Sequence, residues 1–282
     1  MITQIRALSA RPFLKWVGGK NQLIQQYLPH IPEGYRRYYE PFVGGGAIFF
    51  RLQPQQSFLA DINIELVNVY RCVREQVEEL ITLLENHRSL HGQEHFYAVR
   101  SQPTTSDDWF LEGNNLERAA RLIYLNKTCF NGLYRENSKG QFNVPIGSYE
   151  KPIICDSELL RVASSVLQSA QIERSSFDAV LDYAKSSEDF VYFDPPYYPI
   201  SSTSKFTNYS RYSFSEADQI RLKEVFVELS DRGVRVMLSN SDCPFIRDLF
   251  NGFNIHTINA NRNINCNAEK RGKITEVLVT SY

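Results

Sequence analysis

The sequence YYEPFVGGG at residues 38–46 decides the fold of this chain, because a short apolar strand runs directly into a cluster of glycines. A helix is expected to follow through Phe50. The sequence SFLA at residues 57–60 predicts a second strand, which ends at Asp61. This order of strand, glycine turn, helix, strand and acidic residue is typical of a nucleotide site in an α/β fold.

Strand and helix signals continue on both sides of a long helical segment. Apolar residues recur at helical spacing from residue 62 to 100 and from 116 to 126. Further strands are expected at residues 190–193, 234–238, 253–256 and 274–280, and helices at 215–229 and 242–250. We therefore predict a Rossmann-like α/β sheet formed by residues 1–61 and 156–282, interrupted by a mostly α-helical insertion at residues 62–155.

The composition of the 282 residues excludes disorder and low-complexity scaffolds, because 43% are hydrophobic and 22% charged. No run of about 18 apolar residues occurs, so we expect no membrane span, and residues 1–10 lack a signal-peptide pattern. The five cysteines form no CxxC pair, which disfavours a disulfide framework or a zinc site and favours a reducing cytoplasm.

The net charge is only −1, but it is distributed unevenly along the chain. Residues 1–60 sum to +5, residues 61–118 to −6 and residues 119–151 to +3. The basic segments can converge on one face, as a nucleic-acid partner requires. Uneven charge is also common on ordinary protein surfaces, so charge alone leaves the partner open.

The glycines at residues 44–46 favour a ligand that carries adenosine without a pyrophosphate. Glycine lets the backbone approach a ligand where a Cβ atom would clash. No third glycine completes the dinucleotide fingerprint after Ala47, and Asp61 lies nearer than the usual ribose-binding acid. An adenosine ligand whose ribose hydroxyls donate to Asp61 fits better, and an ordinary tight turn is the alternative.

The sequence DPPY at residues 194–197 follows a predicted apolar strand. Two prolines fix the backbone and lack N–H donors, so the carbonyls of Asp194 and Pro195 are held without strand partners. The Asp194 carboxylate and the Pro195 carbonyl suit the two hydrogens of an exocyclic amine, and Tyr197 can stack on the ring that carries it. The predicted catalytic residues are therefore Asp194, Pro195, Pro196 and Tyr197. A simple turn at the end of a strand is the alternative.

A third motif, FLKWVGGK at residues 13–20, places two lysines and an indole around a glycine pair. It is not a phosphate-binding loop, because its glycine spacing differs and Asn21 stands where Ser or Thr is needed. Lys20 can balance a carboxylate such as Asp194, and Trp16 can cover an apolar edge of a ligand. A surface loop before a helix is the alternative.

These three motifs, in this order, closely resemble those of the Dam-type N6-adenine DNA methyltransferases of the D12 class. The resemblance extends from Phe13 to Ser281 and includes NGLYR at residues 131–135 and QFNVP at residues 141–145. It implies an S-adenosylmethionine-dependent enzyme that methylates N6 of adenine in double-stranded DNA, within the sequence GATC.

In that family a target recognition domain lies between the cofactor and catalytic motifs. The resemblance therefore implies that residues 62–155 form this domain and that a β-hairpin at about residues 130–149 reads the DNA. The sequence NSKG at residues 137–140 favours a hairpin turn there.

The resemblance also implies the roles of individual residues. Positions matching the family's cofactor contacts are Trp16, Lys20, Phe42, Gly44, Gly46, Asp61 and Asp194. Positions matching its DNA contacts are Lys15, Phe130, Asn131, Leu133, Arg135, Pro145 and Tyr149. Phe130 stands where the family has a tyrosine that wedges beside the extruded adenine, so a hydroxyl contact is lost. Ser148 stands where close relatives often carry arginine.

Base flipping is expected, with Phe130 filling the gap in the duplex and Tyr197 stacking on the extruded adenine. The loop at residues 201–212 is expected to cover the target pocket, with Phe206 as a candidate lid residue. We expect no metal, no membrane contact, a monomer or weak dimer, and a cytoplasmic, nucleoid-associated protein.

Three alternatives remain at this level. A methyltransferase acting on RNA or on a protein glutamine would keep Asp61 and Asp194 but would not need Lys15, Phe130 and Arg135. A catalytically silent DNA-binding protein could use the same scaffold, although the intact DPPY sequence argues against it. Methylation of N4 of cytosine would use the same amine chemistry.

Overall fold

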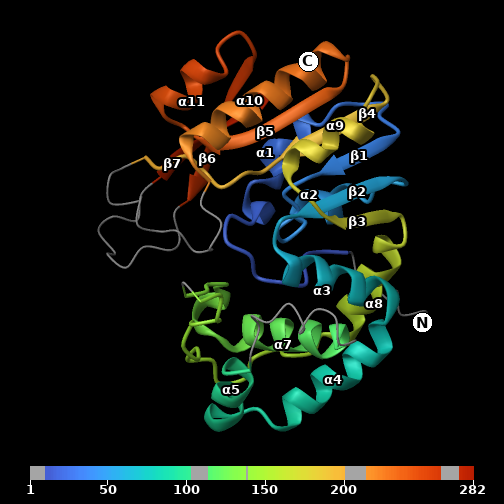
Figure 1. Ribbon diagram of the computed structural model, residues 1–282, viewed down its shortest axis with the longest axis vertical. Helices are drawn as coiled ribbons and strands as arrows, with labels where there is room; N and C mark the ends of the chain where they lie inside the picture. Colours follow the sequence, from blue (N-terminus) through green and yellow to red (C-terminus); the bar gives the residue numbers. More distant parts are fainter. Residues whose placement is uncertain (1–9, 103–113, 138, 201–213, 262–272) are drawn as a thin grey trace, which may run out of the picture.

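The computed structural model describes residues 10–102, 114–137, 139–200, 214–261 and 273–282. One part of the molecule is built on a β-sheet and the other part consists of helices (Figure 1). The helices α3 (Ile64–Glu75) and α8 (Ser157–Leu167) lie where the two parts meet. None of the helices described is long and apolar enough to cross a membrane.

The sheet has seven strands in the order β3-β2-β1-β4-β5-β7-β6. The strands are β1 (Arg37–Glu40), β2 (Ser57–Asp61), β3 (Ala170–Arg174), β4 (Asp189–Phe193), β5 (Arg235–Ser241), β6 (Asn254–Asn261) and β7 (Lys273–Thr280). The pairs from β3 to β5 are parallel, whereas β7 is antiparallel to both β5 and β6. The predicted Rossmann-like fold is confirmed, although β3 was not expected from the sequence.

The order of the strands reverses at β1, which pairs with β2 on one side and with β4 on the other. In open α/β sheets, ligands bind outside the carboxyl ends of the strands at such a switch point. Residues 41–46 follow β1 and residues 194–200 follow β4, so the glycine turn and the DPPY sequence leave the sheet at this same edge.

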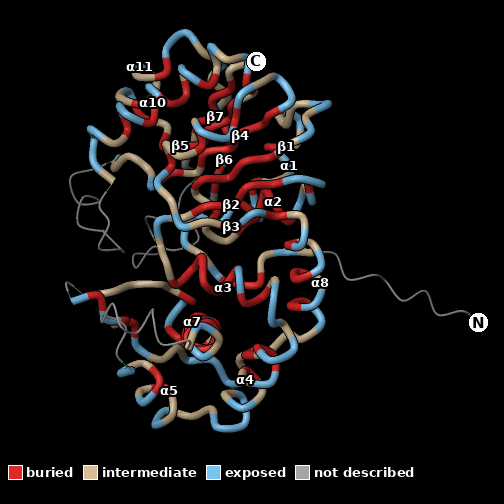
Figure 2. The backbone as a smooth tube through the Cα atoms, turned by 45° about the vertical axis from the view of Figure 1, so that its right-hand side comes forward, coloured by how far each residue is buried: buried red, intermediate tan, exposed pale blue. Residues whose placement is uncertain are grey.

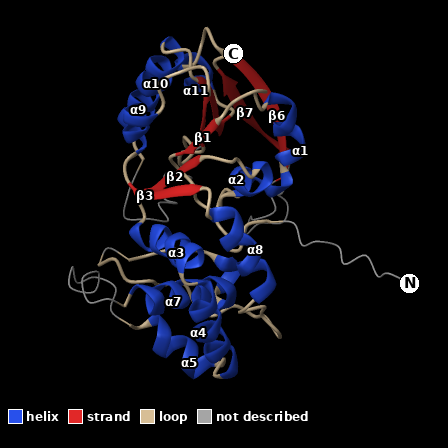
Figure 3. Cartoon of the chain, turned by 90° about the vertical axis from the view of Figure 1, so that its right-hand side faces the viewer, coloured by secondary structure: helices blue, strands red, loops and turns tan. Residues whose placement is uncertain are grey.

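Alternating residues of the strands bury themselves on the two faces of the sheet. Tyr38 and Tyr192 pack into a core with α1 (Ile24–Tyr27), α2 (Ala47–Leu52), α3 and α8. Tyr39 and Val191 pack into a second core with α9 (Val180–Tyr183), α10 (Glu216–Asp231) and α11 (Pro244–Leu249). Figure 3 shows these two sets of helices on opposite faces. A sheet covered on both faces needs nearly continuous apolar strands, as β4 has.

The helical part contains α4 (Val77–Ser89), α5 (Gln93–Arg100) and α7 (Asn115–Thr128). Phe96, Tyr124 and Phe142 belong to its own buried cluster. Apolar residues of α3 and α7 also join the core beneath the sheet, and buried segments continue from the strands into both helices (Figure 2). The division of the chain at residues 62 and 155 therefore stays a prediction.

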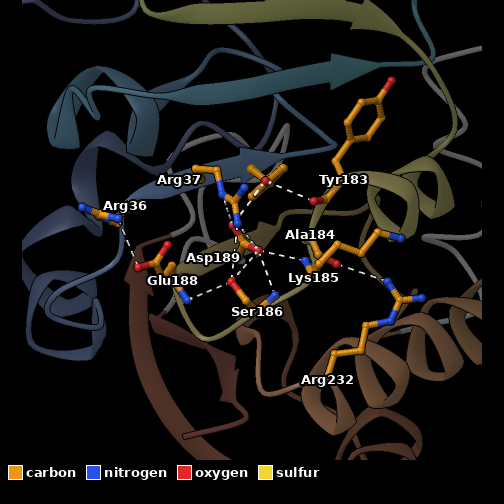
Figure 4. A network of polar contacts seen from close by, with 10 residues as sticks. Arg36, Arg37, Tyr183, Ala184, Lys185, Ser186, Glu188, Asp189 and Arg232 are labelled. Carbon is orange, nitrogen blue, oxygen red and sulfur yellow. Dashed lines mark hydrogen bonds and ion pairs between the residues drawn. The ribbon is translucent and has the colours of Figure 1, made fainter.

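A polar network around the buried Asp189 carboxylate joins β1 to β4 at the amino ends of the two strands (Figure 4). Arg37 and Asp189 are partners in the strand register. The Arg37 Nε and Nη2 atoms donate to the two Asp189 carboxylate oxygens over 2.6 and 3.1 Å. The backbone N–H groups of Lys185 and Ser186 also donate to Asp189, which is fully buried. This network fixes the two strands at the edge opposite the glycine turn and the DPPY sequence.

Candidate active site

Asp194 lies directly after β4, and its carboxylate is fixed by two partners. The Lys20 Nζ atom lies 2.8 Å from Asp194 Oδ1, and the Ser239 hydroxyl on β5 donates to the same oxygen over 2.8 Å. Lys20 is only 3% exposed and also donates to the Gly18 carbonyl over 2.6 Å. The Tyr192 hydroxyl lies 3.0 Å from Ser239 Oγ. The expected pairing of Lys20 with Asp194 is therefore present.

Two oxygen acceptors at this edge have no donor in the described part of the chain. Among the residues that the structure describes, none donates a hydrogen bond to Asp194 Oδ2 or to the Pro195 carbonyl. A carboxylate oxygen and a backbone carbonyl from adjacent residues can accept the two hydrogens of one amino group. The DPPY sequence predicts that these two oxygens bind a substrate amino group, and this role stays a prediction.

Two contacts hold the Tyr197 side chain, one at its hydroxyl and one at its ring. Its hydroxyl donates to Glu276 Oε2 on β7 over 2.8 Å, and the Lys20 ammonium lies 4.7 Å from the centre of its ring. Burial raises the pKa of the Glu276 carboxyl, while the nearby Lys20 ammonium lowers it. The Tyr197 ring therefore has one orientation set by a carboxylate and a cation.

The glycine turn after β1 is tied to Asp61 at the end of β2. The Gly44 N–H donates to Asp61 Oδ2 over 3.2 Å, and the Asn63 N–H donates to Asp61 Oδ1 over 2.9 Å. Gly44 has a φ of +46°, and a Cβ atom there would lie 2.9 Å from the Trp16 ring. Burial raises the pKa of the Asp61 carboxyl to about 6, although these backbone donors lower it. A side chain at residue 44 would therefore be strained and would also collide with Trp16.

Two further predicted cofactor positions pack against aromatic neighbours. Trp16 stacks on Tyr134 with 5.4 Å between ring centroids, which connects the loop before the sheet to the segment after α7. Phe42 stacks on Phe177 at 5.5 Å. Gly46 has a φ of +67°, and a Cβ atom there would lie 2.7 Å from the Tyr70 hydroxyl.

Glu40, the last residue of β1, is a buried carboxyl directly before the glycine turn. It is 2% exposed, and the Tyr38 hydroxyl donates to its Oε2 atom over 2.8 Å. The pKa of Glu40 is raised to about 8, chiefly by burial and also by the nearby Asp194 carboxylate, while the Tyr38 hydroxyl and Lys20 act to lower it. Glu40 is therefore largely protonated at neutral pH, which limits the negative charge around Asp194.

The segment from Cys129 to Ile146 doubles back on itself beside this site. Antiparallel bridges join Cys129 to Ile146 and Glu136 to Phe142, and the Gly140 N–H donates to the Asn137 carbonyl over 2.9 Å. The chain thus reverses at the predicted turn. Phe142 and Val144, beyond the turn, are buried in the core of the helical part.

Several predicted DNA contacts lie on this reversed segment or next to its ends in the sequence or the structure. The Lys15 Nζ atom donates to the Tyr149 hydroxyl over 3.2 Å and lies 4.4 Å from the centre of its ring. The Phe130 N–H donates to the Pro145 carbonyl over 2.9 Å. Phe130 is 49% exposed, although an aromatic ring is normally buried. All four residues are exposed, and they form two contacting pairs, Lys15 with Tyr149 and Phe130 with Pro145.

The remaining predicted DNA contacts, Arg135, Asn131 and Leu133, have different surroundings. Arg135 Nε donates to Asn143 Oδ1 over 2.7 Å. Asn131 is exposed and has a φ of 56°, which asparagine tolerates better than most residues. Leu133 is partly buried against the core of the helical part. The loop at 201–212, with the candidate lid residue Phe206, lies outside the described residues.

Metal ligands do not gather anywhere in the described ranges, where no group of three or more His, Cys, Asp or Glu side chains could hold a metal ion. Two neighbours of the site, Ser239 and Glu276, were not assigned from the sequence. The signals for both were weak, because Ser239 lies in the apolar strand β5 and Glu276 reads as one polar residue in an alternating strand.

A Rossmann-like sheet with a glycine turn and a DPPY sequence on either side of its switch point defines a methyltransferase that acts on an amino group. The family model of D12 class N6 adenine-specific DNA methyltransferases matches residues 16–264. The chain belongs to this family. The resemblance inferred from the motifs is therefore confirmed, and the protein is an adenine-specific DNA methyltransferase.

Individual relatives match along almost their whole length. The chain is 46% identical over 287 residues to the type II methyltransferase M1.LlaDCHI of Lactococcus lactis subsp. cremoris, covering 100% of this chain and 99% of the relative. It is 41% identical to the type II methyltransferase M.MjaIII of Methanocaldococcus jannaschii, covering 98% and 100%. It is 36% identical to a DNA adenine methylase of Vibrio cholerae, covering 95% of each.

Proposed function

We propose that this enzyme transfers a methyl group from S-adenosylmethionine to N6 of adenine in double-stranded DNA, within GATC, after flipping the adenine out of the duplex. Asp194 and the Pro195 carbonyl grip the target amino group. Residues of the reversed segment between Cys129 and Ile146, together with Lys15 and Tyr149, contact the DNA.

The glycine turn fits an adenosine-containing cofactor. S-adenosylmethionine, when bound, supplies an electrophilic methyl group on a sulfonium sulfur. Each Asp61 oxygen already accepts one backbone N–H and keeps a lone pair for a ribose hydroxyl. A side chain at Gly44 would close the space beside Trp16. Lys20 and Trp16 complete the cofactor contacts.

The amino group of adenine is a weak nucleophile because its lone pair is delocalised into the ring. Asp194 Oδ2 and the Pro195 carbonyl would each accept one N–H, which favours tetrahedral geometry and localises the lone pair on nitrogen. Lys20 and Ser239 hold the other Asp194 oxygen, so the carboxylate is oriented before the substrate arrives. The methylated nitrogen loses its proton readily, and no strong general base is required.

The target base must leave the duplex before these two oxygens can reach it, which costs a few kcal/mol of stacking and pairing. Phe130 is the exposed ring that would fill the gap. Tyr197, fixed by Glu276 and Lys20, would stack on the extruded adenine. Arg135 would hold a guanine in the major groove, and Leu133 and Pro145 would contact thymine methyl groups.

The single observation that carries this proposal is the Asp194 carboxylate, fixed at one oxygen by Lys20 and Ser239 and followed by a Pro195 carbonyl that accepts no hydrogen bond from the described residues. The test is to map methylated bases in DNA from cells that express the wild-type chain or Asp194→Asn. We expect N6-methyladenine at GATC in the first DNA and unmodified GATC in the second. N6-methyladenine confined to another sequence would overturn the GATC assignment, and N4-methylcytosine would overturn the choice of base.

A further inference from the structure

Gln219 on α10 and Asn240 on β5 form a buried amide pair beneath the loop that follows β4. The Asn240 Nδ2 atom donates to Gln219 Oε1 over 2.9 Å. Gln219 is 1% exposed and Asn240 is fully buried. Buried amides are costly unless their donors and acceptors are satisfied, so the other bonds of this pair reveal what it holds.

The outer atoms of the pair hold the backbone of the DPPY loop. Gln219 Nε2 donates to the Pro196 carbonyl over 2.9 Å. Asn240 Oδ1 accepts the Tyr198 N–H over 3.0 Å and the Ser241 N–H over 2.8 Å. Each amide nitrogen thus has an acceptor and each amide oxygen a donor. Exchanging the oxygen and nitrogen positions of either amide would set donors against donors and acceptors against acceptors. Each amide group therefore has one orientation in this network.

These bonds fix the loop on both sides of Tyr197. The Pro196 carbonyl before the ring and the Tyr198 N–H after it are both bound, and the Ser241 hydroxyl donates to the Tyr198 carbonyl over 2.5 Å. The Pro195 carbonyl takes no hydrogen bond from the described part of the chain. The amide pair therefore engages the Pro196 carbonyl and not the Pro195 carbonyl that precedes it.

We propose that Gln219 and Asn240 are positioning residues that aim the Pro195 carbonyl and the Tyr197 ring at the target amino group. This inference rests on the function proposed above for the same loop. Apolar side chains at both positions would leave the Pro196 carbonyl and the Tyr198 N–H without these partners. Displacement of a reacting group by about 1 Å can cost on the order of 100-fold in rate.

The first test uses Gln219→Met, which preserves volume and removes both amide bonds. Gln168→Met is the control, because Gln168 also donates to a backbone carbonyl, that of Arg74, but far from the site. We expect Gln219→Met to slow single-turnover methyl transfer by about 100-fold. Affinities for S-adenosylmethionine and GATC DNA should stay within threefold of wild type, and the control should keep the wild-type rate.

The second test separates positioning from folding by its pH dependence. In Gln219→Glu the introduced carboxyl can donate to the Pro196 carbonyl only while it is protonated, and burial favours the protonated form. Its transfer rate relative to wild type should therefore be highest at low pH and should fall as pH rises. A purely structural role would not reproduce this profile in an enzyme whose thermal unfolding is unchanged.

The outcomes are distinct. A rate for Gln219→Met within threefold of wild type overturns the inference. A parallel loss of rate, cofactor affinity and DNA affinity also overturns it, because the pair would then only maintain the fold. If the wild-type enzyme itself transfers no methyl group to adenine, the proposed function fails, and the same assay shows this independently of the variants.

Discussion

The Lys20 ammonium lies 2.8 Å from Asp194 Oδ1, and both groups lie at the switch point of the sheet. The same oxygen accepts the Ser239 hydroxyl. One side of the carboxylate is thus saturated by two donors, while its second oxygen has no donor among the described residues. A carboxylate held in this way is an oriented acceptor before any substrate binds.

Replacing Asp194 by Asn removes the negative charge and the pair with Lys20. We expect the single-turnover rate of methyl transfer to fall by at least about 100-fold, the loss typical of one preorganised polar contact. DNA binding should change little, because the other predicted DNA contacts are made by residues of the reversed segment, Lys15 and Tyr149. Near wild-type turnover in this variant would contradict the mechanism.

Arg135→Ala should relax sequence discrimination more than it weakens binding. A guanidinium that engages guanine in the major groove contributes about 1–3 kcal/mol of discrimination. The measurement compares kcat/KM on GATC with kcat/KM on duplexes altered at one base pair. Lys139→Ala, at the exposed end of the turn, is the control and should leave the ratio unchanged. An equal loss on all duplexes would show that Arg135 contacts only the backbone.

Cofactor affinity should depend on pH through Asp61. Burial raises the pKa of its carboxyl to about 6, so the carboxylate that accepts ribose hydroxyls is lost as pH falls below that value. We expect the Kd for S-adenosylmethionine to rise by up to about tenfold for each further pH unit. Titration calorimetry from pH 5 to 8 measures this. Asp61→Asn should bind more weakly and lack the slope, and an identical slope in that variant would refute the assignment.

Asp189→Asn should destabilise the fold without impairing the chemistry directly. It breaks the pair between the fully buried Asp189 carboxylate and Arg37, which is 40% exposed, and it leaves the N–H donors of Lys185 and Ser186 poorly matched, which costs about 1–3 kcal/mol. Glu188→Gln is the control, because the neighbouring pair of Arg36 and Glu188 is exposed and such pairs contribute about 0–1 kcal/mol. Urea unfolding of both variants tests the difference. Equal stabilities would show that the network in Figure 4 does not fix β1 to β4.

Local sequence was sufficient to predict the elements that form the switch point. The glycines after Glu40 and the prolines after Asp194 interrupt apolar strands, and such interruptions mark the ends of strands without any tertiary information. The helix predicted from residue 215 is also present, and α10 begins with a capping box in which Ser215 and Asp218 are bonded to each other's backbone.

Other features depend on contacts between residues that are distant in sequence. The sequence AQIER of β3 is too short and too polar to predict a strand by itself. Its parallel pairing with β2 identifies it as a strand in the structure. Gln219 reads as a polar residue on an amphipathic helix, and only the packing of α10 against β5 brings it to Asn240. Glu276 becomes part of the site because β7 runs antiparallel beside β5.

The most direct test of the central claim is methyl transfer by the purified enzyme from radiolabelled S-adenosylmethionine to short duplexes. One duplex contains a single GATC. The control duplex has the same sequence, except that other base pairs replace the adenine–thymine pairs of this site. We predict that label enters N6 of adenine in the GATC duplex alone. Label in cytosine, equal label in both duplexes, or no label in either would contradict the account.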